Sequence, residues 1–408
     1  MNLDLDFVRR QFPSSCWNWA FFENAGGSYV PQSVIDRTVA YMTECQVQPN
    51  GAFEPSAKAT ERIKAGHQVA AEMINAAPEE VVMGRSTTGN IYVLAHALRP
   101  LFKPGDELIV TNTDHEANVG AWRRLAEFGV KIKEWKVNPE TAMLEIESLR
   151  TLLTNRTRLV CVTHCSNITG GINDVAAIAK MAHDAGAWVC VDAVAYVAHR
   201  AVDVKALDVD FYAFSLYKLY GPHVAALYGK HQRLLEARGQ NHFFIVEDEI
   251  PQKLNPGGPS HEFTAALQGL GDYFDALYKH HFKDAKNRFR QRVKDVYGPI
   301  VRHEETLARR FLDFLLSKPN VRLLGPPTAD PAKRAPTFGF TVKGKKSAEI
   351  PPFAHAKKIA IRNENFWAWR LMDSFGIDQH DGVVRVSMVH YNTTEEVDRL
   401  IQALDPVL

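Results

Sequence analysis

Between about residues 60 and 230 the chain alternates short apolar runs with segments whose apolar residues have helical spacing. The expected strands are 81–83, 107–110, 158–163, 188–191 and 210–214, and the expected helices around them include 57–75, one that ends near 97, and 175–185. Strands that are separated by helices pair in parallel through right-handed crossovers. The alternation therefore predicts an α/β fold in which helices flank a mostly parallel sheet.

The pattern changes after residue 230. Residues 230–295 lose the alternation, and residues 273–316 predict one or two long helices. From residue 321 short strands, at 321–323 and 337–342, alternate with helices that begin near 350 and 394. Because a chain of 408 residues exceeds the usual size of one domain, we predict two. The predicted ranges are 1–20 for an N-terminal segment of the small domain, 21–295 for the large domain, and 296–408 for the C-terminal, α+β part of the small domain.

The composition excludes several classes of protein. A formal net charge of +1 gives no basic surface of the kind that binds nucleic acid. No apolar run approaches the roughly 18 residues of a membrane helix, and the acidic residues 1–6 lack the apolar core of a signal peptide. The five cysteines are scattered and odd in number, which favours reduced thiols. We therefore expect a cytoplasmic protein that binds neither nucleic acid nor a membrane.

The candidate site residues follow the predicted strands. Parallel sheets bind ligands at the carboxyl ends of their strands. This rule places five polar side chains at one edge of the predicted sheet: Thr87, His115, Asn167, Asp192 and Lys218.

Asp192 and Lys218 are the pair that pyridoxal 5'-phosphate chemistry requires. The lysine amine must be uncharged to form a Schiff base, and a dry pocket lowers its pKa. The aspartate keeps the pyridine nitrogen protonated, so that the ring accepts electrons. By themselves the two residues fit equally well a core aspartate and a lysine whose amine reaches the surface. The other motifs of the chain have to decide between these interpretations.

Three of these motifs also have two interpretations each. Residues 86–89 follow a strand and begin a helix, which suits either a bound phosphate or a simple N-cap. His115 could stack on an aromatic cofactor or lie in a plain loop. Asn167 could donate to a phenolate oxygen or form a turn.

Two other kinds of site are rejected. Ser215-x-x-Lys218 matches the Ser-x-x-Lys of serine acyl-transfer enzymes, but the companion Ser-Asp-Asn and Lys-Thr-Gly motifs are absent. His115 does not begin a zinc motif, because Val119 stands where His-Glu-x-x-His needs its second histidine. Cys161 and Cys165 have no second pair of ligands at metal-binding spacing. We therefore expect no metal.

Taken together, the motifs resemble the class V aminotransferase family of fold-type I pyridoxal-phosphate enzymes, and within it the cysteine desulfurase and selenocysteine lyase group. The resemblance runs from residues 21–27, Phe-Phe-Glu-Asn-Ala-Gly-Gly, to residues 391–398, which is nearly the whole chain. Its specificity lies in the order of the motifs: Thr-Thr, Asp-His, Ser-Asn, Val-Asp, Ser-x-x-Lys-x-x-Gly-Pro and Arg…Tyr-Asn-Thr. The implied fold is a large domain that binds pyridoxal 5'-phosphate and a smaller α+β domain.

The resemblance also implies roles for individual residues. Lys218 forms the Schiff base, Asp192 pairs with the pyridine nitrogen, His115 stacks on the ring, and Asn167 contacts the ring oxygen. The residues implied at the phosphate are Thr87, Thr88, Ser215 and Tyr217. Thr264 resembles the family's threonine that reaches the phosphate of the neighbouring subunit, which implies a homodimer; a helix cap is its alternative.

The implied substrate residues are Arg385, Asn24 and Trp367. A guanidinium matches a carboxylate bidentately, so Arg385 is expected to bind the α-carboxylate of the substrate; a surface ion pair is its alternative. Desulfurases carry a catalytic cysteine shortly before this arginine, but here Trp367 stands in its place and no cysteine follows Cys190. Ala195 and Tyr217 also depart from the family, which usually has Gln or His near the ring and His before the lysine.

We therefore expect a desulfurase-like enzyme that depends on pyridoxal 5'-phosphate and acts on a small amino acid. Abstraction of the α-proton followed by β-elimination, a C–S or C–X lyase reaction, needs no protein thiol. Transamination and epimerisation are alternatives. A catalytically silent binding protein with this fold is a further alternative, against which the retention of Lys218, Asp192, His115 and Arg385 argues.

Overall fold

The structure is a computed structural model that describes residues 2–284 and 286–408. Met1 and Ala285 lie outside the described residues, although the predicted ranges 1–20, 21–295 and 273–316 include them.

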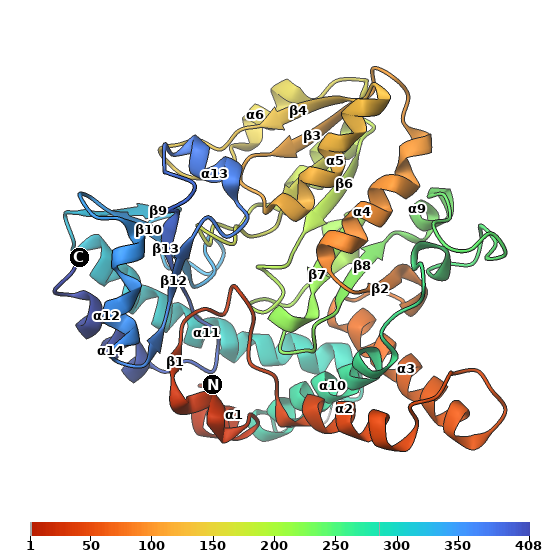
Figure 1. The fold of residues 1–408 in the computed structure, drawn as a ribbon, viewed down its shortest axis with the longest axis horizontal. Coiled ribbons are helices and arrows are strands. Elements are labelled where there is room, and N and C mark those ends of the chain that lie inside the picture. Colours follow the sequence, from red (N-terminus) through yellow and green to blue (C-terminus); the bar gives the residue numbers. More distant parts are fainter. Residues whose placement is uncertain (1, 285) are drawn as a thin grey trace.

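A seven-stranded sheet forms the centre of the larger part of the molecule (Figure 1). Its strands are β2 (Val81–Gly84), β3 (Glu107–Thr111), β4 (Lys131–Trp135), β5 (Thr157–Thr163), β6 (Trp188–Asp192), β7 (Phe211–Ser215) and β8 (Ala225–Gly229). They lie in the order β2-β8-β7-β6-β5-β3-β4, and all neighbours from β7 to β4 pair in parallel. The prediction of a mostly parallel sheet is confirmed.

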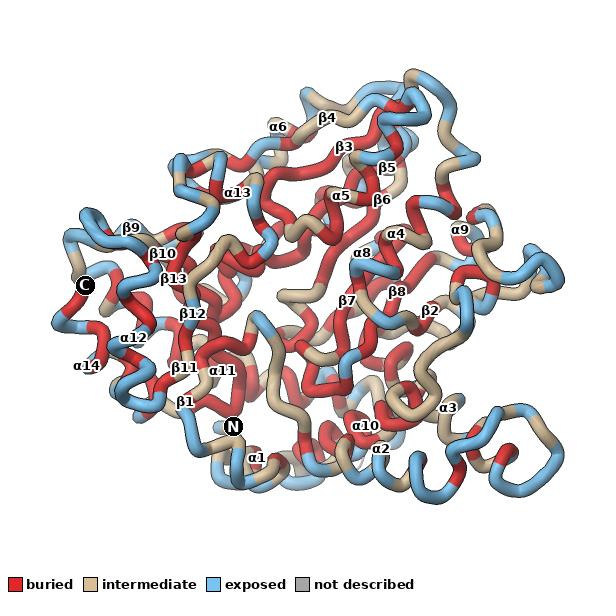
Figure 2. Tube along the Cα trace, in the orientation of Figure 1, coloured by how far each residue is buried: buried red, intermediate tan, exposed pale blue. Residues whose placement is uncertain are grey.

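Both faces of this sheet are buried under helices. Leu159 and Cys161 of β5 pack with α4 (Thr87–Leu98) and α5 (Gly120–Arg123), whereas Val160 and Val162 pack with α7 (Val175–Asp184) and α10 (His261–His281). Successive residues of a strand point to opposite faces, so a strand covered on both sides needs a continuous apolar run. Figure 2 shows these strands as the buried centre of the molecule.

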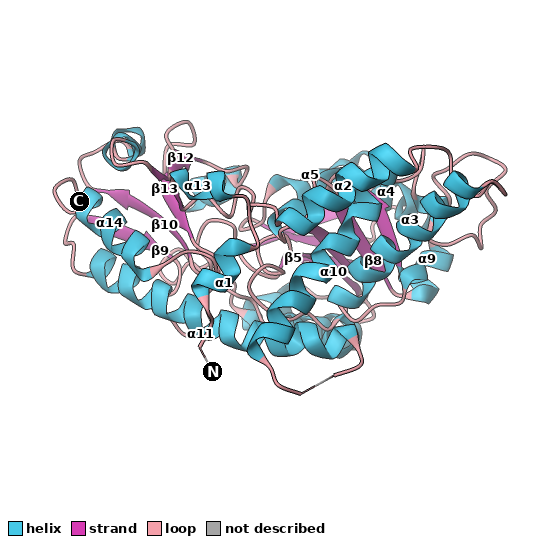
Figure 3. Ribbon diagram, turned by 90° about the horizontal axis from the view of Figure 1, so that it is seen from below, coloured by secondary structure: helices cyan, strands magenta, loops and turns pink. Residues whose placement is uncertain are grey.

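A second sheet lies beside the large one (Figure 3). It is antiparallel, with the order β12-β13-β10-β9, and its strands are β9 (Val321–Leu324), β10 (Thr337–Val342), β12 (Arg362–Glu364) and β13 (Val383–Ser387). The long helix α11 (Phe289–Leu316) packs with the large-sheet core through Val296 and with the small-sheet core through Phe311. The predicted boundary at residue 295 falls inside α11, so the domain ranges remain a prediction.

The remaining elements frame the two sheets. The parallel pair β1 (Ala20–Phe21) and β11 (Ile359–Ala360) joins the N-terminal segment to the smaller part. The other helices are α1 (Leu5–Arg10), α2 (Gln32–Glu44), α3 (Glu54–Met73), α6 (Ile146–Leu152), α8 (Val204–Leu207), α9 (His231–Glu236), α12 (Pro351–His355), α13 (Trp369–Ser374) and α14 (Thr394–Leu404). Within the described ranges, none of the helices combines the length and apolar character needed to cross a bilayer.

Several details differ from the sequence analysis, among them strand β8, which was not predicted. Strand β2 was expected to pair in parallel, but it pairs antiparallel with β8, which follows β7 closely enough for an antiparallel connection. Strand β4 was not predicted, because it alternates charged residues at the edge of the sheet. Helix α10 begins at His261 rather than near 273; its Gly269, a weak helix former, packs against the backbone of Ser33.

Candidate active site

A cavity lies at the carboxyl ends of β3, β5, β6 and β7, and we call it the inner cavity. Its walls are Ser86, Thr87, Thr88, His115, Ala117, Thr163, Cys165, Asn167, Asp192, Val194, Ala195, Ser215, Tyr217 and Lys218. The structure therefore brings together all eight residues that the sequence analysis assigned to one cofactor in one subunit. Thr264, the ninth predicted cofactor residue, lies elsewhere.

Lys218 lies in a short 3-10 helix, η6 (Leu216–Lys218), directly after β7, and its side chain is buried. Burial and, to a lesser extent, the nearby Arg385 lower the pKa of its amine to about 8, while Asp192 and Glu23 act in the opposite direction. A pKa near 8 leaves a useful fraction of the amine neutral around neutral pH, which is the form that acts as a nucleophile.

Asp192 ends β6 and faces the same cavity. Its Oδ1 accepts a hydrogen bond from the backbone N–H of Val194 at 2.9 Å. Burial raises the pKa of this carboxyl to about 6, although the Val194 bond and Lys218 both favour the charged form. A cationic partner would return the carboxyl to its charged form, so the position favours a protonated ligand nitrogen.

His115 forms the N-cap of a short 3-10 helix, η4 (Glu116–Asn118), and its Nδ1 accepts a hydrogen bond from Ala117 N at 3.1 Å. Burial lowers its pKa to about 3, and the charges of Lys218 and Arg385 add to this effect. The ring is therefore neutral near neutral pH. Because a backbone N–H only donates, the proton of the neutral ring is on Nε2.

Hydroxyl groups gather at the N-terminus of α4. Thr87 Oγ1 lies 2.7 Å from Ser215 Oγ. Ser86 is the N-cap of α4 and accepts a hydrogen bond from Gly89 N at 3.0 Å, so the capping interpretation of this motif holds for Ser86. Thr88 is exposed at the same turn, and Tyr217 stacks on His223 with ring centroids 4.2 Å apart. A helix N-terminus lined by hydroxyl groups is suited to an anion.

Arg385, on β13, lies behind Asn167 and does not line the inner cavity. It is buried, with 2% of its surface exposed. Its Nη2 donates to Glu23 Oε1 at 2.6 Å and its Nη1 donates to the carbonyl oxygen of Asn167 at 3.2 Å. The Phe366 ring covers the guanidinium, 3.6 Å from Cζ. The alternative of a surface ion pair is therefore wrong, because the pair with Glu23 is buried.

Asn24 and Trp367, the other two predicted substrate residues, lie outside the inner cavity. Asn24 Nδ2 donates to the Ser387 carbonyl at 2.8 Å, and its Oδ1 accepts from Tyr391, so its side chain joins the N-terminal segment to β13 and the segment after it. Trp367 is 69% exposed, and its ring centroid lies 6.3 Å from that of His115.

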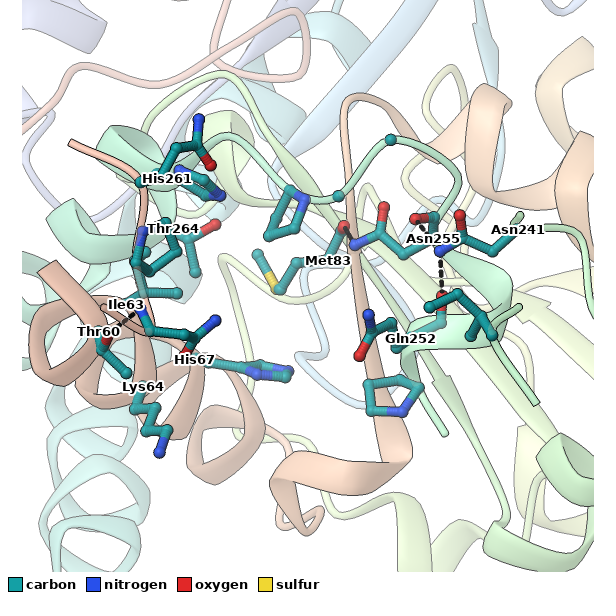
Figure 4. A pocket seen from close by; sticks show the side chains of 18 of the residues that line it. Thr60, Ile63, Lys64, His67, Met83, Asn241, Gln252, Asn255, His261 and Thr264 are labelled. Atoms are coloured by element: carbon teal, nitrogen blue, oxygen red, sulfur yellow. Dashed lines mark hydrogen bonds between the residues drawn. The ribbon is translucent and has the colours of Figure 1, made fainter. Parts of the chain in front are cut away.

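Thr264 lies in a separate cavity of ≈ 590 Å³ between α3, α10 and the loop 241–259. Figure 4 shows Thr264 and His261 from α10 opposite residues of the loop, with Met83 between them in this view. The Oγ1 of Thr264 is buried and has no hydrogen-bond partner among residues 2–284 and 286–408. Its predicted contact with a neighbouring subunit remains a prediction.

The sequence analysis missed three residues that shape the site. Glu23 and Phe366 contact Arg385. Asp114 accepts hydrogen bonds from Thr163 N at 3.0 Å and from Asn118 Nδ2 at 2.7 Å, and burial raises its pKa to about 7. Asp114 thereby ties the end of β3 to the end of β5. A charged residue directly after the apolar run 20–22 was the available signal for Glu23, and the aromatic cluster of Phe366, Trp367 and Trp369 was the available signal for Phe366.

Comparison with known proteins agrees with this geometry. The family model "Aminotransferase class-V" matches residues 20–400. The "Aminotransferase-like protein FGM3" of Gibberella zeae is 40% identical over 100% of this chain and 99% of its own length. The "Cysteine desulfurase-like protein ustD" of Aspergillus flavus is 34% identical over 100% of this chain and 91% of its own. The apo structure of a cysteine desulfurase from Thermococcus onnurineus matches with a TM-score of 0.87 and 26% identity, covering 100% of this chain and 98% of that one. The resemblance and the fold class inferred from the motifs are confirmed.

The lowered pKa of Lys218 is directly testable. In cofactor-free protein whose amines carry ¹³C-methyl groups, the Lys218 resonance should titrate near the pKa of about 8 rather than at the roughly 10.4 of a free lysine. The charged form is lost as the pH rises through this value, so reaction with aldehydes should become fast above it. Lys218→Arg identifies the resonance. A midpoint near that of a free lysine would contradict the assignment of the amine to a dry site.

Proposed function

This chain belongs to the class V aminotransferase family of pyridoxal-phosphate enzymes, and on that premise we propose that it is a cysteine desulfurase-like lyase. We propose a small amino acid as its substrate, with abstraction of the α-proton followed by β-elimination of a sulfur or other leaving group. The observation that carries the proposal is the buried Lys218, whose amine has a pKa of about 8, in one cavity with Asp192 and His115.

The donor set of the inner cavity suits pyridoxal 5'-phosphate. Thr87, Ser215 and the N-terminus of α4 would hold the phosphate, with Thr88 and Tyr217 beside them. Asp192 would face the ring nitrogen, and the neutral ring of His115 would lie against the pyridine. Asn167 would reach the ring oxygen. When bound, the cofactor supplies an electron sink for the pair of electrons released when a bond to the substrate α-carbon breaks.

Each residue of the site would then have its own role in the reaction. Lys218 Nζ would hold the cofactor, and its amine in the neutral form would accept the proton from the substrate α-carbon. Asp192 would keep the ring nitrogen protonated. Arg385 would bind the substrate carboxylate, and its Nε has no hydrogen-bond partner within the described part of the chain. Asn24 would position the β13 end of this subsite, and Trp367 would flank its entrance.

The cysteines support elimination without a protein-bound persulfide. A thiolate is the form that accepts sulfur, but burial raises the pKa of the Cys165 thiol, the only cysteine in the wall of the inner cavity, to about 12. Cys161 is also buried, and its pKa is raised by burial and by Cys190. All five cysteines are free thiols, which supports a reducing compartment such as the cytoplasm.

A homodimer is part of the proposal. Thr264 lies in a cavity of its own, and the loop beside it presents Phe243, 98% exposed, and Phe244, 62% exposed, to solvent. Exposed aromatic side chains of this kind favour contact with another surface. A second copy that covers the loop would bring the partner subunit's Thr264 towards a phosphate site.

The reaction can be tested with β-chloro-L-alanine and L-cysteine as probes. Both should shift the absorbance of the bound cofactor, and both should give pyruvate and ammonia together with chloride or sulfide. Lys218→Ala should abolish turnover. Asp192→Asn should raise the barrier by about 3–4 kcal/mol, the size of a major electrostatic element, whereas the exposed Asp184→Asn should not. A keto acid formed while the leaving group is retained, or racemisation alone, would replace elimination by transamination or epimerisation.

The thiols are not expected to take part. A variant in which all five cysteines are replaced by serine or alanine should still release sulfide from L-cysteine, because direct elimination needs no thiol. Mass spectrometry of the wild-type protein after turnover should find no persulfide. A persulfide trapped on Cys165, or sulfide release that vanishes in Cys165→Ser while the cofactor stays bound, would restore a desulfurase mechanism with a relocated nucleophile.

Light scattering should give twice the chain mass of 45.8 kDa. Replacing both Phe243 and Phe244 by aspartate should shift the protein towards the monomer, since charged side chains would have to be desolvated in the contact. The matched control is Phe353→Asp on α12, which is 48% exposed and distant in the fold from the loop. A wild-type monomer at working concentration would contradict the dimer.

A further inference from the structure

We propose that Phe366 and Glu23 form a closed cover over Arg385, and that a substrate carboxylate reaches this arginine only when residues 365–368 swing outwards. We call these residues the cover segment. The inference rests on the proposed function in one respect, the assignment of Arg385 as the carboxylate site. It adds a conformational step and two residues, Phe366 and Glu23, that control access.

The guanidinium of Arg385 is closed on three sides. Glu23 occupies Nη2 at 2.6 Å, the Asn167 carbonyl occupies Nη1 at 3.2 Å, and the Phe366 ring lies 3.6 Å from Cζ. Two atoms of this cluster, Arg385 Nε and Glu23 Oε2, are buried and have no hydrogen-bond partner in the described part of the chain. Such groups are rarely left unpaired in native proteins. The closed arrangement therefore lacks a partner that a bound carboxylate would supply to Nε.

The cover segment separates two cavities. On its inner side, Asn167 Nδ2, in the wall of the inner cavity, donates to the Phe366 carbonyl at 3.0 Å. On its outer side lies a cavity of ≈ 630 Å³ whose walls include Trp367, Trp369 and Glu116. A ligand that enters from the outer cavity meets the segment before it meets Arg385. Opening would also free Asn167 Nδ2, which is proposed to serve the ring oxygen.

The segment is held at its ends and strained in its middle. Phe366 and Trp367 have φ of +47° and +60°, a left-handed conformation that bulky residues rarely adopt. Asn365 Nδ2 donates to the Gln379 carbonyl at 2.9 Å, and the backbone at Gly382 packs so closely that a Cβ there would lie 2.6 Å from Asn365 N. After the segment, α13 is anchored by the buried Leu371. The outward movement of the cover segment is therefore expected to be largest at the two strained residues, Phe366 and Trp367.

The opening must break the hydrogen bond from Asn167 Nδ2 to the Phe366 carbonyl and expose the Phe366 ring, which is buried, but few other contacts resist it. The Trp367 carbonyl accepts one hydrogen bond, from Glu116 N at 2.8 Å, and its side chain is mostly exposed. Glu23 also has a second cation within reach, because Arg362 Nη1 lies 3.7 Å from its Oε1. An incoming carboxylate can thus displace Glu23 from Arg385 without leaving Glu23 unpaired, which would be costly for a buried charge.

The test uses propanoate, which carries a carboxylate but no amine and so cannot react with the cofactor. Holoenzyme labelled with 5-fluorotryptophan is titrated with propanoate and followed by ¹⁹F NMR, and Trp367→Phe assigns the Trp367 line. We expect this line to shift with propanoate and not with equal amounts of propanamide or sodium chloride. A Trp367 line that stays unmoved overturns the proposal.

Two variants test whether Phe366 and Glu23 weaken the binding of propanoate. Phe366→Ala should lower the propanoate concentration at the titration midpoint by about threefold or more. Without the ring, propanoate no longer has to displace it to reach Arg385. Glu23→Gln should lower this concentration as well, since it removes the competing anion. The control Phe128→Ala removes an aromatic ring that also covers an arginine, Arg99, at 4.6 Å, and should change nothing. A midpoint that rises in Phe366→Ala would mean that Phe366 is a fixed wall of the subsite, and would overturn the cover.

The cover and the lyase reaction can fail independently of each other. If amino acids shift the cofactor absorbance but the Trp367 line does not respond to propanoate, the cover is wrong and the lyase proposal stands. If propanoate moves the line with the expected variants but no amino acid is turned over, the cover stands and the lyase proposal fails.

Discussion

The burial of the large sheet on both faces decides where polar side chains can lie. Successive residues of β5 and β6 pack into separate apolar cores on the two sides of the sheet, so an unpaired charge inside a strand would be strongly destabilising. Asp192 and Ser215 accordingly occupy the last positions of β6 and β7. His115 and Lys218 follow in the next turns. The inner cavity is the place where these strand ends meet.

Desolvation then sets the chemistry inside the cavity, and it acts on each group according to its charge. It lowers the pKa of the Lys218 amine to about 8 and that of His115 to about 3, and it raises that of the Cys165 thiol to about 12. The burial that gives Lys218 a neutral, nucleophilic amine therefore keeps Cys165 in its unreactive form. The lowered pKa of the lysine amine and the raised pKa of the cysteine thiol have the same physical cause, which is burial.

Arg385 is the point at which three distant parts of the chain meet. Glu23 comes from the segment after β1, Asn167 from the loop after β5, and Phe366 from the turn between β12 and α13. Their contacts join the small sheet to the edge of the large one. A change at any of the three alters the charge or the access of the guanidinium, so the environment of Arg385 depends on how the two parts of the molecule pack.

The sequence by itself determined the central strands, the order of the motifs and the eight residues around the inner cavity. These depend on patterns that neighbouring residues carry: apolar runs, helix starts, and polar residues at strand ends. The sequence did not predict the edge strand β4, because charged residues lie between its apolar residues and leave no apolar run. Only the tertiary structure decided the pairing of Glu23 with Arg385, 362 positions apart, the cover by Phe366, and the separate cavity of Thr264. Such contacts leave no local pattern, because they arise from the packing of segments that are far apart in the chain.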